Sequence, residues 1–283
     1  DSHEAVEMLS HFVDAGGTLV ECSASHGDGM AVDVVAEAMA SLGRHRVVVA
    51  WRGGVRRTGE GAWVGAAGRG DLLRSLDDAL ARLDTDYVDL WLVEPRDEVP
   101  LAETLEAASV AYRSGRARYV WLSRASHWQL AEAVTRGEIG ASAPISAVEF
   151  PFSLAPAQCA STVAELASRG VGVIAASALA GGVLTGKYRH STPADSRAAS
   201  PHLRHMVQPY LTGSSRGVIE AASRAAAGLD RSMGDVALAW VRDYPGVSSA
   251  LVGPRTVRQL DTLLEHKDPL PAPIRQVLGE VAL

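Results

Sequence analysis

Short runs of apolar, mostly β-branched residues recur along this chain, and nearly all of them end at a polar residue or are followed directly by one. They occupy residues 18–22, 46–51, 87–93, 118–122, 145–149, 171–176 and 248–252. Segments with helical periodicity separate them, such as 4–15, 156–168 and the helix expected after Asp71, where Leu72, Leu76, Leu80 and Leu83 recur at intervals of three and four. Strands that alternate with helices predict a parallel sheet. Because parallel strands end at a common edge, the polar residues there are expected to meet in one site.

The alternation predicts an α/β fold, and the length suits a (β/α)8 TIM barrel. The chain has 283 residues, 47% of them hydrophobic, so it can bury one large core and is expected to form a single domain over 1–283. The apolar runs supply seven strands and the chain opens on a helix, so we expect the first strand to be missing from the N-terminus as given. Two Gly-rich or Pro-rich segments, 53–70 and 181–215, are expected to be long loops.

Composition excludes several classes of partner. The formal net charge is -6 and there is no long basic run, so nucleic acid is not expected. No apolar stretch reaches about 18 residues, so no membrane span is expected, and the first residues do not form a signal peptide. The two cysteines, Cys22 and Cys159, show neither CxxC nor metal spacing, which favours a reducing compartment, the cytoplasm.

Several longer motifs resemble the aldo-keto reductase family. The resemblance runs from about residue 4 to 264 and is carried by Asp71–Leu76 with Arg82–Leu92, by Gly115–Ser123, by Gly181–Tyr188 and by Val252–Thr256 with Gln259 and Leu260. It implies a (β/α)8 barrel that reduces carbonyl compounds with NADPH. The family's missing first strand would then lie upstream of Asp1.

The family's catalytic tetrad of Asp, Tyr, Lys and His is substituted at all four positions. The resemblance places Glu21 at the aspartate, His26 at the tyrosine, Arg52 at the lysine and Glu94 at the histidine. The nicotinamide clamp also differs, because the family's Ser-Asn pair reads Ser123-Arg124 and its glutamine reads Glu149. Arg124 and Glu149 are expected to form a second charge pair in a substrate pocket, which Trp51 and Trp91 line if they point inward rather than toward the helices.

The phosphate-binding segments match the family more closely, so NADP is the cofactor that the resemblance implies. The matching residues of the cofactor site are Ser123, Ser177, Leu179, Gly181, Lys187, Gly253, Arg255, Thr256 and Gln259. The last four fall at a helix start, where backbone N–H groups favour anions. No metal site is expected, since His202 and His205 have no carboxylate or cysteine near them in the sequence.

Three functions remain open from the sequence. The first, favoured by the substituted tetrad, is a non-redox acid/base enzyme (a dehydratase, isomerase or cyclase) for a small oxygenated metabolite, with His26, Glu94, Arg52 and Glu21 as the catalytic group. The second is an NADP-dependent oxidoreductase that reduces a carbonyl with His26 as proton donor. The third is a catalytically silent barrel that binds a ligand or partner, in which Glu21, Arg52 and Glu94 form a structural ion-pair cluster.

Overall fold

The protein is described by a computed structural model that covers residues 2–155, 159–194, 196–211 and 213–282. It divides into two compact units, unit 1 over Asp1–Val148 and unit 2 over Glu149–Leu283. Whether the chain acts as the single domain expected from its length stays a prediction. In the described residues, no helix is both long enough and apolar enough to cross a membrane.

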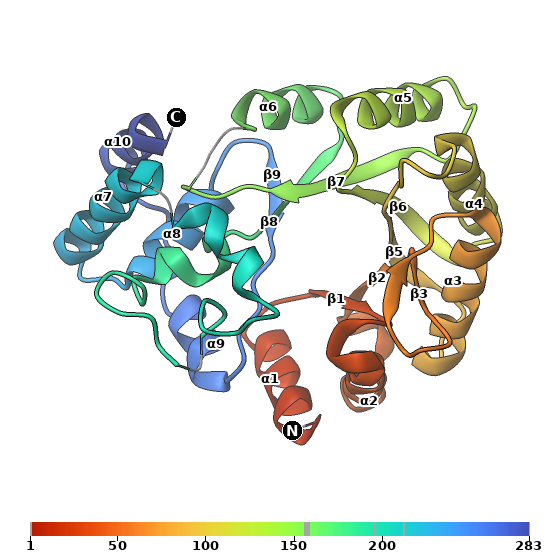
Figure 1. The fold of residues 1–283 in the computed structure, drawn as a ribbon, viewed down its shortest axis with the longest axis horizontal. Coiled ribbons are helices and arrows are strands. Elements are labelled where there is room, and N and C mark those ends of the chain that lie inside the picture. The colour runs from red at the N-terminus through yellow and green to blue at the C-terminus, as the bar shows by residue number, and fades with distance from the viewer. Residues whose placement is uncertain (1, 156–158, 195, 212, 283) are drawn as a thin grey trace. The chain divides into compact units, whose positions relative to one another are not determined.

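Unit 1 alternates strands and helices as predicted, and Figure 1 shows α2, α3 and α4 along one side of its strands. Strands β1, β2, β5 and β6 are neighbours in that order, and all of these pairings are parallel. Its elements are α1 (Ser2–Asp14), β1 (Leu19–Ser23), η1 (His26–Gly29), α2 (Met30–Leu42), η2 (Arg44–Arg46), β2 (Val48–Arg52), β3 (Val55–Arg57), β4 (Trp63–Gly65), α3 (Arg69–Leu83), β5 (Val88–Val93), α4 (Leu101–Arg113), β6 (Ala117–Ser123) and α5 (His127–Glu138). Strand β7 (Ile145–Pro151) carries the chain from unit 1 into unit 2.

Helix α3 illustrates how the sequence pattern creates the core of unit 1. The predicted apolar face is buried, with Leu72 and Leu76 at 0% exposure and Leu83 at 2%. Each fully buried leucine contributes about 1.5–3 kcal/mol of transfer free energy. The helix ends at Asp84, which has a left-handed φ of 49° and whose backbone N–H donates to the Leu80 carbonyl.

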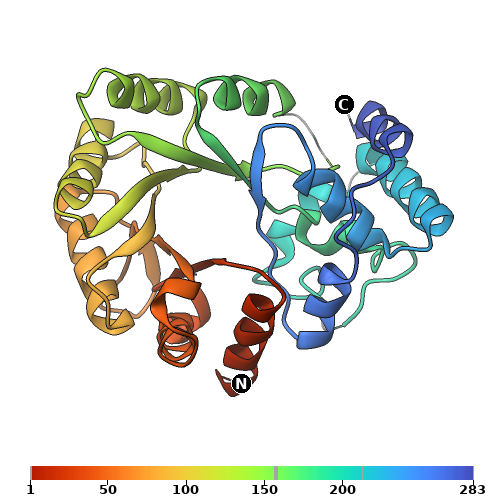
Figure 2. The same ribbon diagram turned by 180° about the vertical axis from the view of Figure 1, so that it is seen from behind.

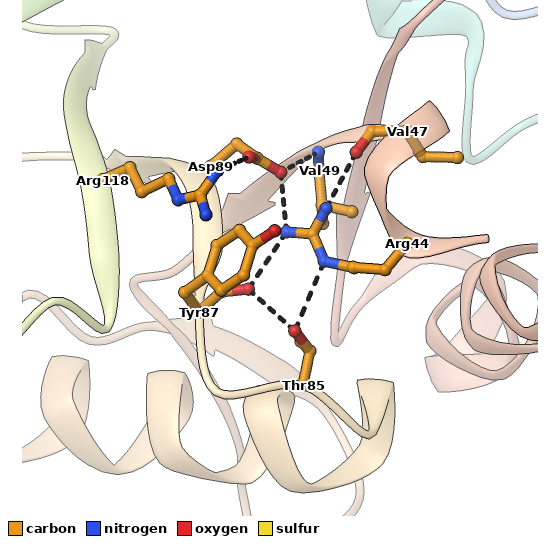
Figure 3. Close-up of polar contacts among 7 residues, drawn as sticks. All are labelled: Arg44, Val47, Val49, Thr85, Tyr87, Asp89 and Arg118. Atoms are coloured by element: carbon orange, nitrogen blue, oxygen red, sulfur yellow. Dashed lines mark hydrogen bonds and ion pairs between the residues drawn. The ribbon is translucent and has the colours of Figure 1, made fainter.

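The amino ends of β2, β5 and β6 are held by a polar cluster (Figure 3). Asp89 accepts hydrogen bonds from the backbone N–H of Val49 at 2.9 Å, from Arg44 Nη2 at 2.7 Å and from Arg118 Nη1 at 3.4 Å. The Tyr87 ring lies 4.2 Å from the Arg44 guanidinium carbon and 3.6 Å from that of Arg118. These contacts connect the amino ends of three strands, and they lie at the edge of the sheet opposite the carboxyl ends that carry the polar site residues.

The segment 53–70, predicted to be a loop, contains an antiparallel hairpin. Val55 pairs with Gly65, and Arg57 pairs with Trp63. The prediction was wrong here because strands of three residues are too short to show an alternating pattern among glycines. The backbone N–H of Thr58 donates to the Ala62 carbonyl at 2.8 Å and closes the hairpin.

The described residues of unit 2 form a parallel strand pair, five α-helices and the predicted irregular segment. Strand β8 pairs with β9 in a parallel register that shifts between Val173 and Ile174. The elements are α6 (Ala160–Ser168), β8 (Gly172–Ala176), η3 (Ala180–Thr185), η4 (Arg204–Met206), η5 (Gln208–Tyr210), α7 (Gly213–Leu229), α8 (Met233–Arg242), β9 (Val247–Ala250), α9 (Val257–Leu264) and α10 (Ala272–Ala282). The start predicted for α6, residues 156–158, lies outside the described residues. Figure 2 shows α8, α9 and α10 of this unit from behind.

Candidate active site

The strand register of unit 1 places several predicted site residues on one face of the sheet. Ser23 is level with Arg52, Arg52 with Leu92, and Leu92 with Trp121. Side chains two residues apart on a strand point to the same face. Glu21 therefore lies on the same face of the sheet as Arg52. The same alternation places Ser123 on this face, at the carboxyl end of β6, and Glu94 follows directly after the last residue of β5.

Arg52 connects these residues. Its Nε donates to Glu21 Oε1 at 2.6 Å, and its Nη1 donates to Ser123 Oγ at 3.0 Å. The same Nη1 lies 3.7 Å from Glu94 Oε2. The side chains of Arg52, Glu21 and Glu94 are 14%, 13% and 10% exposed, so the ion pairs are largely shielded from water. Charge-assisted hydrogen bonds of this kind hold a guanidinium in a fixed orientation.

Glu94 is also bordered by two other arginines. Arg96 Nη2 lies 2.9 Å from Glu94 Oε1, and Arg124 Nε lies 3.9 Å from Glu94 Oε2. Sequence reasoning missed Arg96, because no local pattern in the sequence indicates the contacts that bring it to Glu94. Within unit 1, Arg124 forms an ion pair with Glu94, and the expected pair of Arg124 with Glu149 stays a prediction. Glu149 itself is buried, at 6% exposure.

His26 is carried on a backbone that takes unusual dihedral angles. It begins η1, where Gly27, Asp28 and Gly29 have φ values of 58°, 56° and 96°. Asp28 is anchored to the β3–β4 hairpin, accepting a hydrogen bond from Trp63 Nε1 at 2.9 Å and contacting Arg57 Nη2 at 3.1 Å. The hairpin therefore fixes the loop that presents the histidine.

The electrostatic environment of His26 favours its neutral form. Partial burial lowers the pKa of His26 below its usual value of 6.5, and the positive charge of Arg52 lowers it further. The Glu21 carboxylate opposes both by raising that pKa. The imidazole still reaches solvent, because His26 is an exposed residue. At neutral pH it is therefore mainly an uncharged base and hydrogen-bond donor.

Trp51 and Trp91 lie on the other face of the strands. They are level with each other and with Cys22, one residue out of phase with Arg52. They are 2% and 0% exposed, and the indole nitrogen of Trp91 is so close to Gly53 that a Cβ there would lie 2.8 Å from it. Of the two orientations left open, the register supports packing toward the helices rather than a place beside Arg52 and Glu94. Burial raises the pKa of the neighbouring Cys22 thiol to about 12, so this cysteine is not a nucleophile.

Unit 2 brings together the residues predicted to bind phosphates. Gly181 and Gly182 have φ values of 65° and 98°, and a Cβ at Gly182 would lie 2.9 Å from Lys187 Nζ. Because Gly181 and Gly182 have no side chains, the backbone of the loop after Ser177 and Leu179 can pack directly against the Lys187 side chain. Ser177 also has a left-handed φ, 54°. This cradle of backbone and ammonium suits an anionic group.

Arg197, which sequence reasoning missed, lies between the two phosphate segments. Its Nη1 donates to the Gly181 carbonyl at 3.4 Å, and its Nη2 would be 3.8 Å from a Cβ at Gly253. No motif pointed to this arginine, since it lies among polar residues in an irregular segment. Lys187 and Arg197 therefore place two positive charges at this loop.

The second phosphate segment begins α9. Thr256 is the N-cap and its Oγ1 accepts a hydrogen bond from the backbone N–H of Gln259 at 3.2 Å. The side chain of Gln259 in turn accepts from the backbone N–H of Arg255 at 2.8 Å. Gln259 thus orders the backbone that carries Arg255, an exposed residue at the helix start. The residues present fit a phosphate-bearing cofactor at this segment and at the glycine loop.

Among the described residues, no group of three or more His, Cys, Asp or Glu side chains is arranged to hold a metal ion. Within that part of the chain, His202 and His205 belong to no such group.

Comparison with known proteins identifies the family. A family model described as "Aldo/keto reductase family" matches residues 1–268. The chain belongs to this family. Its fold is the (β/α)8 barrel of aldo-keto reductase type, as predicted, and a solved glycerol dehydrogenase from Gluconobacter oxydans superimposes with a TM-score of 0.84 at 20% identity, over 99% of this chain and 85% of that one.

Two curated relatives of the aldo-keto reductase chain illustrate its similarity to proteins with different names. It is 30% identical to an L-glyceraldehyde 3-phosphate reductase of Escherichia coli K12, over 72% of this chain and 62% of the relative. It is 28% identical to a probable voltage-gated potassium channel subunit beta of Oryza sativa, over 99% of this chain and 87% of the relative.

The family membership corrects the first functional hypothesis. The expectation of a non-redox dehydratase, isomerase or cyclase was wrong, because the family and the named reductase relative indicate oxidation and reduction. That expectation rested on the identity of four side chains. A histidine can exchange a proton with a substrate oxygen as a tyrosine does, so substitution at these positions does not by itself remove redox chemistry.

Proposed function

We propose that this aldo-keto reductase family member is an NADP(H)-dependent oxidoreductase that interconverts a carbonyl group and an alcohol on a small-molecule substrate. Family membership supports the reaction type, and the relative named L-glyceraldehyde 3-phosphate reductase supports a small carbonyl substrate. The observation that carries the proposal is His26, held on the anchored η1 loop within the electrostatic influence of Glu21 and Arg52.

His26 exchanges the proton with the substrate oxygen. When bound, a reduced nicotinamide supplies a hydride to the carbonyl carbon, and the alcohol oxygen needs one proton to complete the reduction. The imidazolium of His26 donates that proton, and in the reverse direction the neutral imidazole removes it from the alcohol. Because its pKa is lowered, His26 is better prepared at neutral pH to accept a proton than to donate one.

Arg52 keeps a fixed positive charge beside that oxygen. Glu21 and Ser123 accept hydrogen bonds from two different nitrogens of its guanidinium, so the group does not need to reorganise when negative charge develops on the substrate. The carboxylates of Glu21 and Glu94, which are largely shielded from water, limit the positive charge at the site.

The cofactor's phosphates are assigned to unit 2. Ser177, Leu179, Gly181 and Lys187, together with Arg197, form the pyrophosphate loop, and Gly253, Arg255, Thr256 and Gln259 form the segment for the 2′-phosphate. Arginine beside an ordered helix start favours NADP over NAD, since only NADP carries a phosphate there. We also propose that the residues which hold the nicotinamide ring differ from those of the family at two positions, Arg124 and Glu149.

The decisive experiment measures NADPH oxidation at 340 nm with a panel of aldehydes and ketones, together with NADPH binding by fluorescence. We expect turnover that falls at least about 100-fold in His26→Gln, as typical for loss of a general acid or base. The exposed His11 of α1 supplies the control, and His11→Gln should keep full activity. NADPH binding with no turnover of any substrate would support a ligand-binding barrel instead.

A second measurement tests the cofactor assignment without depending on activity. Arg255→Gln should weaken NADPH binding by about 10-fold, the effect of one charge-assisted hydrogen bond, and leave NADH binding unchanged. Arg258→Gln, at an exposed position three residues further on α9, is the matched control. Equal losses for NADPH and NADH would contradict the assignment to the 2′-phosphate.

We also propose a reducing, cytoplasmic location, which the two free thiols of Cys22 and Cys159 support.

A further inference from the structure

Three arginines surround one carboxylate at the candidate active site. Arg52, Arg96 and Arg124 come from the ends of β2, β5 and β6, and each lies within 4 Å of Glu94. Within unit 1 this cluster holds three positive charges against the two negative charges of Glu21 and Glu94. A single glutamate does not need three arginines, so part of the positive charge is available to another anion.

Arg96 is held rigidly in place. Its guanidinium carbon would be 2.6 Å from a Cβ at Gly65, so the group lies directly against the backbone of β4 and only glycine leaves room for it. Its Nε is buried and has no hydrogen-bond partner among the described residues. Its Nη2 contacts Glu94 at 2.9 Å, and its side chain keeps 36% of its surface exposed. The guanidinium is therefore positioned in advance and still open to solvent.

Arg124 differs from Arg96 because it is not committed to Glu94. Its side chain is 69% exposed, and its 3.9 Å separation from Glu94 is too long for a hydrogen bond. An ion pair this exposed contributes little to stability. The residue also has a φ of 51°, a left-handed conformation that glycine or asparagine adopts with less strain. Neither folding nor the ion pair explains an arginine at this position.

We infer that Arg124 and Arg96 form a binding site for an anionic group of the substrate, so that the preferred substrates are carbonyl compounds bearing a carboxylate or a phosphate. This rests on the proposed function and specifies its substrate class. Arg96 supplies a preorganised guanidinium, and Arg124 supplies a largely exposed one that can contact the same anion. The planar fork of each arginine matches the two oxygens of a carboxylate or a phosphate.

The test compares 4-carboxybenzaldehyde with its neutral methyl ester as substrates, which differ in charge at one position. The wild-type protein should show a kcat/KM at least about 10-fold higher for the acid, the value of one charge-assisted hydrogen bond. In Arg124→Asn the KM for the acid should rise about 10-fold relative to the KM for the ester, whereas an effect of the substitution on the cofactor would change both substrates alike. Glyceraldehyde 3-phosphate against glyceraldehyde makes the same comparison for a phosphate.

Arg74 provides a matched control in the same unit. Its side chain is 71% exposed and lies 3.5 Å from Asp71, much like Arg124 and Glu94. Arg74→Asn should leave both KM values unchanged. Arg124→Asn should fold at least as stably as the wild type, because asparagine accepts the left-handed conformation. Equal KM changes in the two variants, or no preference for the acid in the wild type, would overturn the inference.

A binding measurement separates this inference from the proposed function. Benzoate carries the anion but no reducible carbonyl, so its binding, followed by calorimetry, does not depend on turnover. Binding that is lost in Arg124→Asn and kept in Arg74→Asn supports the anion site even if neither aldehyde is reduced. Turnover of both aldehydes with no benzoate binding and no difference in KM leaves the oxidoreductase standing and refutes the anion site.

Discussion

Arg52 donates a hydrogen bond from Nε to the Glu21 carboxylate over 2.6 Å, with both side chains less than 15% exposed. Removing the guanidinium leaves Glu21 and Glu94 as shielded carboxylates without that counter-charge. We expect Arg52→Met to lower the free energy of unfolding by about 3 kcal/mol, measured by urea denaturation. Arg46, whose ion pair with Asp14 is 42% and 66% exposed, serves as control, and Arg46→Met should cost less than about 1 kcal/mol. Similar losses in the free energy of unfolding for both variants would show that shielding of the Arg52 ion pairs from water does not contribute to stability.

The lowered pKa of His26 fixes the direction of the pH dependence. Reduction needs the imidazolium, so kcat/KM for a carbonyl should fall as the pH rises through a midpoint below 6.5. Oxidation needs the neutral form, so kcat/KM for the alcohol should rise through the same midpoint and then level off. Both profiles should lose this step in His26→Gln.

Glu21 should move that midpoint. Its carboxylate raises the pKa of His26, so Glu21→Gln should shift both profiles to lower pH. Exposed Glu37 of α2 gives the control, since Glu37→Gln should leave the midpoint in place. A shift to higher pH in Glu21→Gln would contradict the electrostatic assignment.

The contact between Trp63 and Asp28 should affect rate more than stability. Trp63→Phe removes the indole donor at 2.9 Å, and we expect kcat to fall about 5-fold, the effect of about 1 kcal/mol, with unchanged NADPH affinity. Asp28→Asn keeps an oxygen acceptor for Trp63 and should keep the rate. Asp28→Gly relieves the left-handed φ but loses both anchors, so it should be stable and slow. Trp128→Phe, at a 77% exposed site, is the control.

The cluster around Asp89 should contribute to stability alone. Asp89→Asn keeps the shape but loses the charge that faces Arg44 and Arg118, and we expect a loss of about 1–3 kcal/mol by urea denaturation. Asp33 is also 2.7 Å from an arginine, Arg82, yet its side chain is 68% exposed against 14% for Asp89. Asp33→Asn should therefore cost far less. A fall in NADPH affinity in Asp89→Asn would contradict this prediction, because it would show that the cluster also affects cofactor binding.

The sequence was sufficient where a repeating pattern determines the structure. The leucines of α3 were predicted from their spacing, and Arg52 was expected beside Glu21 and Glu94 because parallel strands end at one edge. The structure confirms α3, and it places Arg52 between the two carboxylates. In both cases, local periodicity carries the three-dimensional information.

The sequence was insufficient where long-range packing decides. Arg96 becomes a site residue because Gly65, thirty-one positions earlier, leaves space for its guanidinium, and no local pattern records that contact. The hairpin of β3 and β4 was missed because its strands are short. The lowered pKa of His26 depends on burial and on Arg52, so residue type alone suggested a better acid than the structure supports.

Asp28 shows how the β3–β4 hairpin governs chemistry that takes place elsewhere. Asp28 has a left-handed φ that glycine would adopt with less strain. Its carboxylate accepts hydrogen bonds from Trp63 and Arg57 and so connects the His26 loop to the hairpin. Changes in the length or sequence of the hairpin would therefore shift His26 without altering a strand of the parallel sheet. Variants that accept new substrates could be sought there first, in a segment whose alteration leaves the core intact.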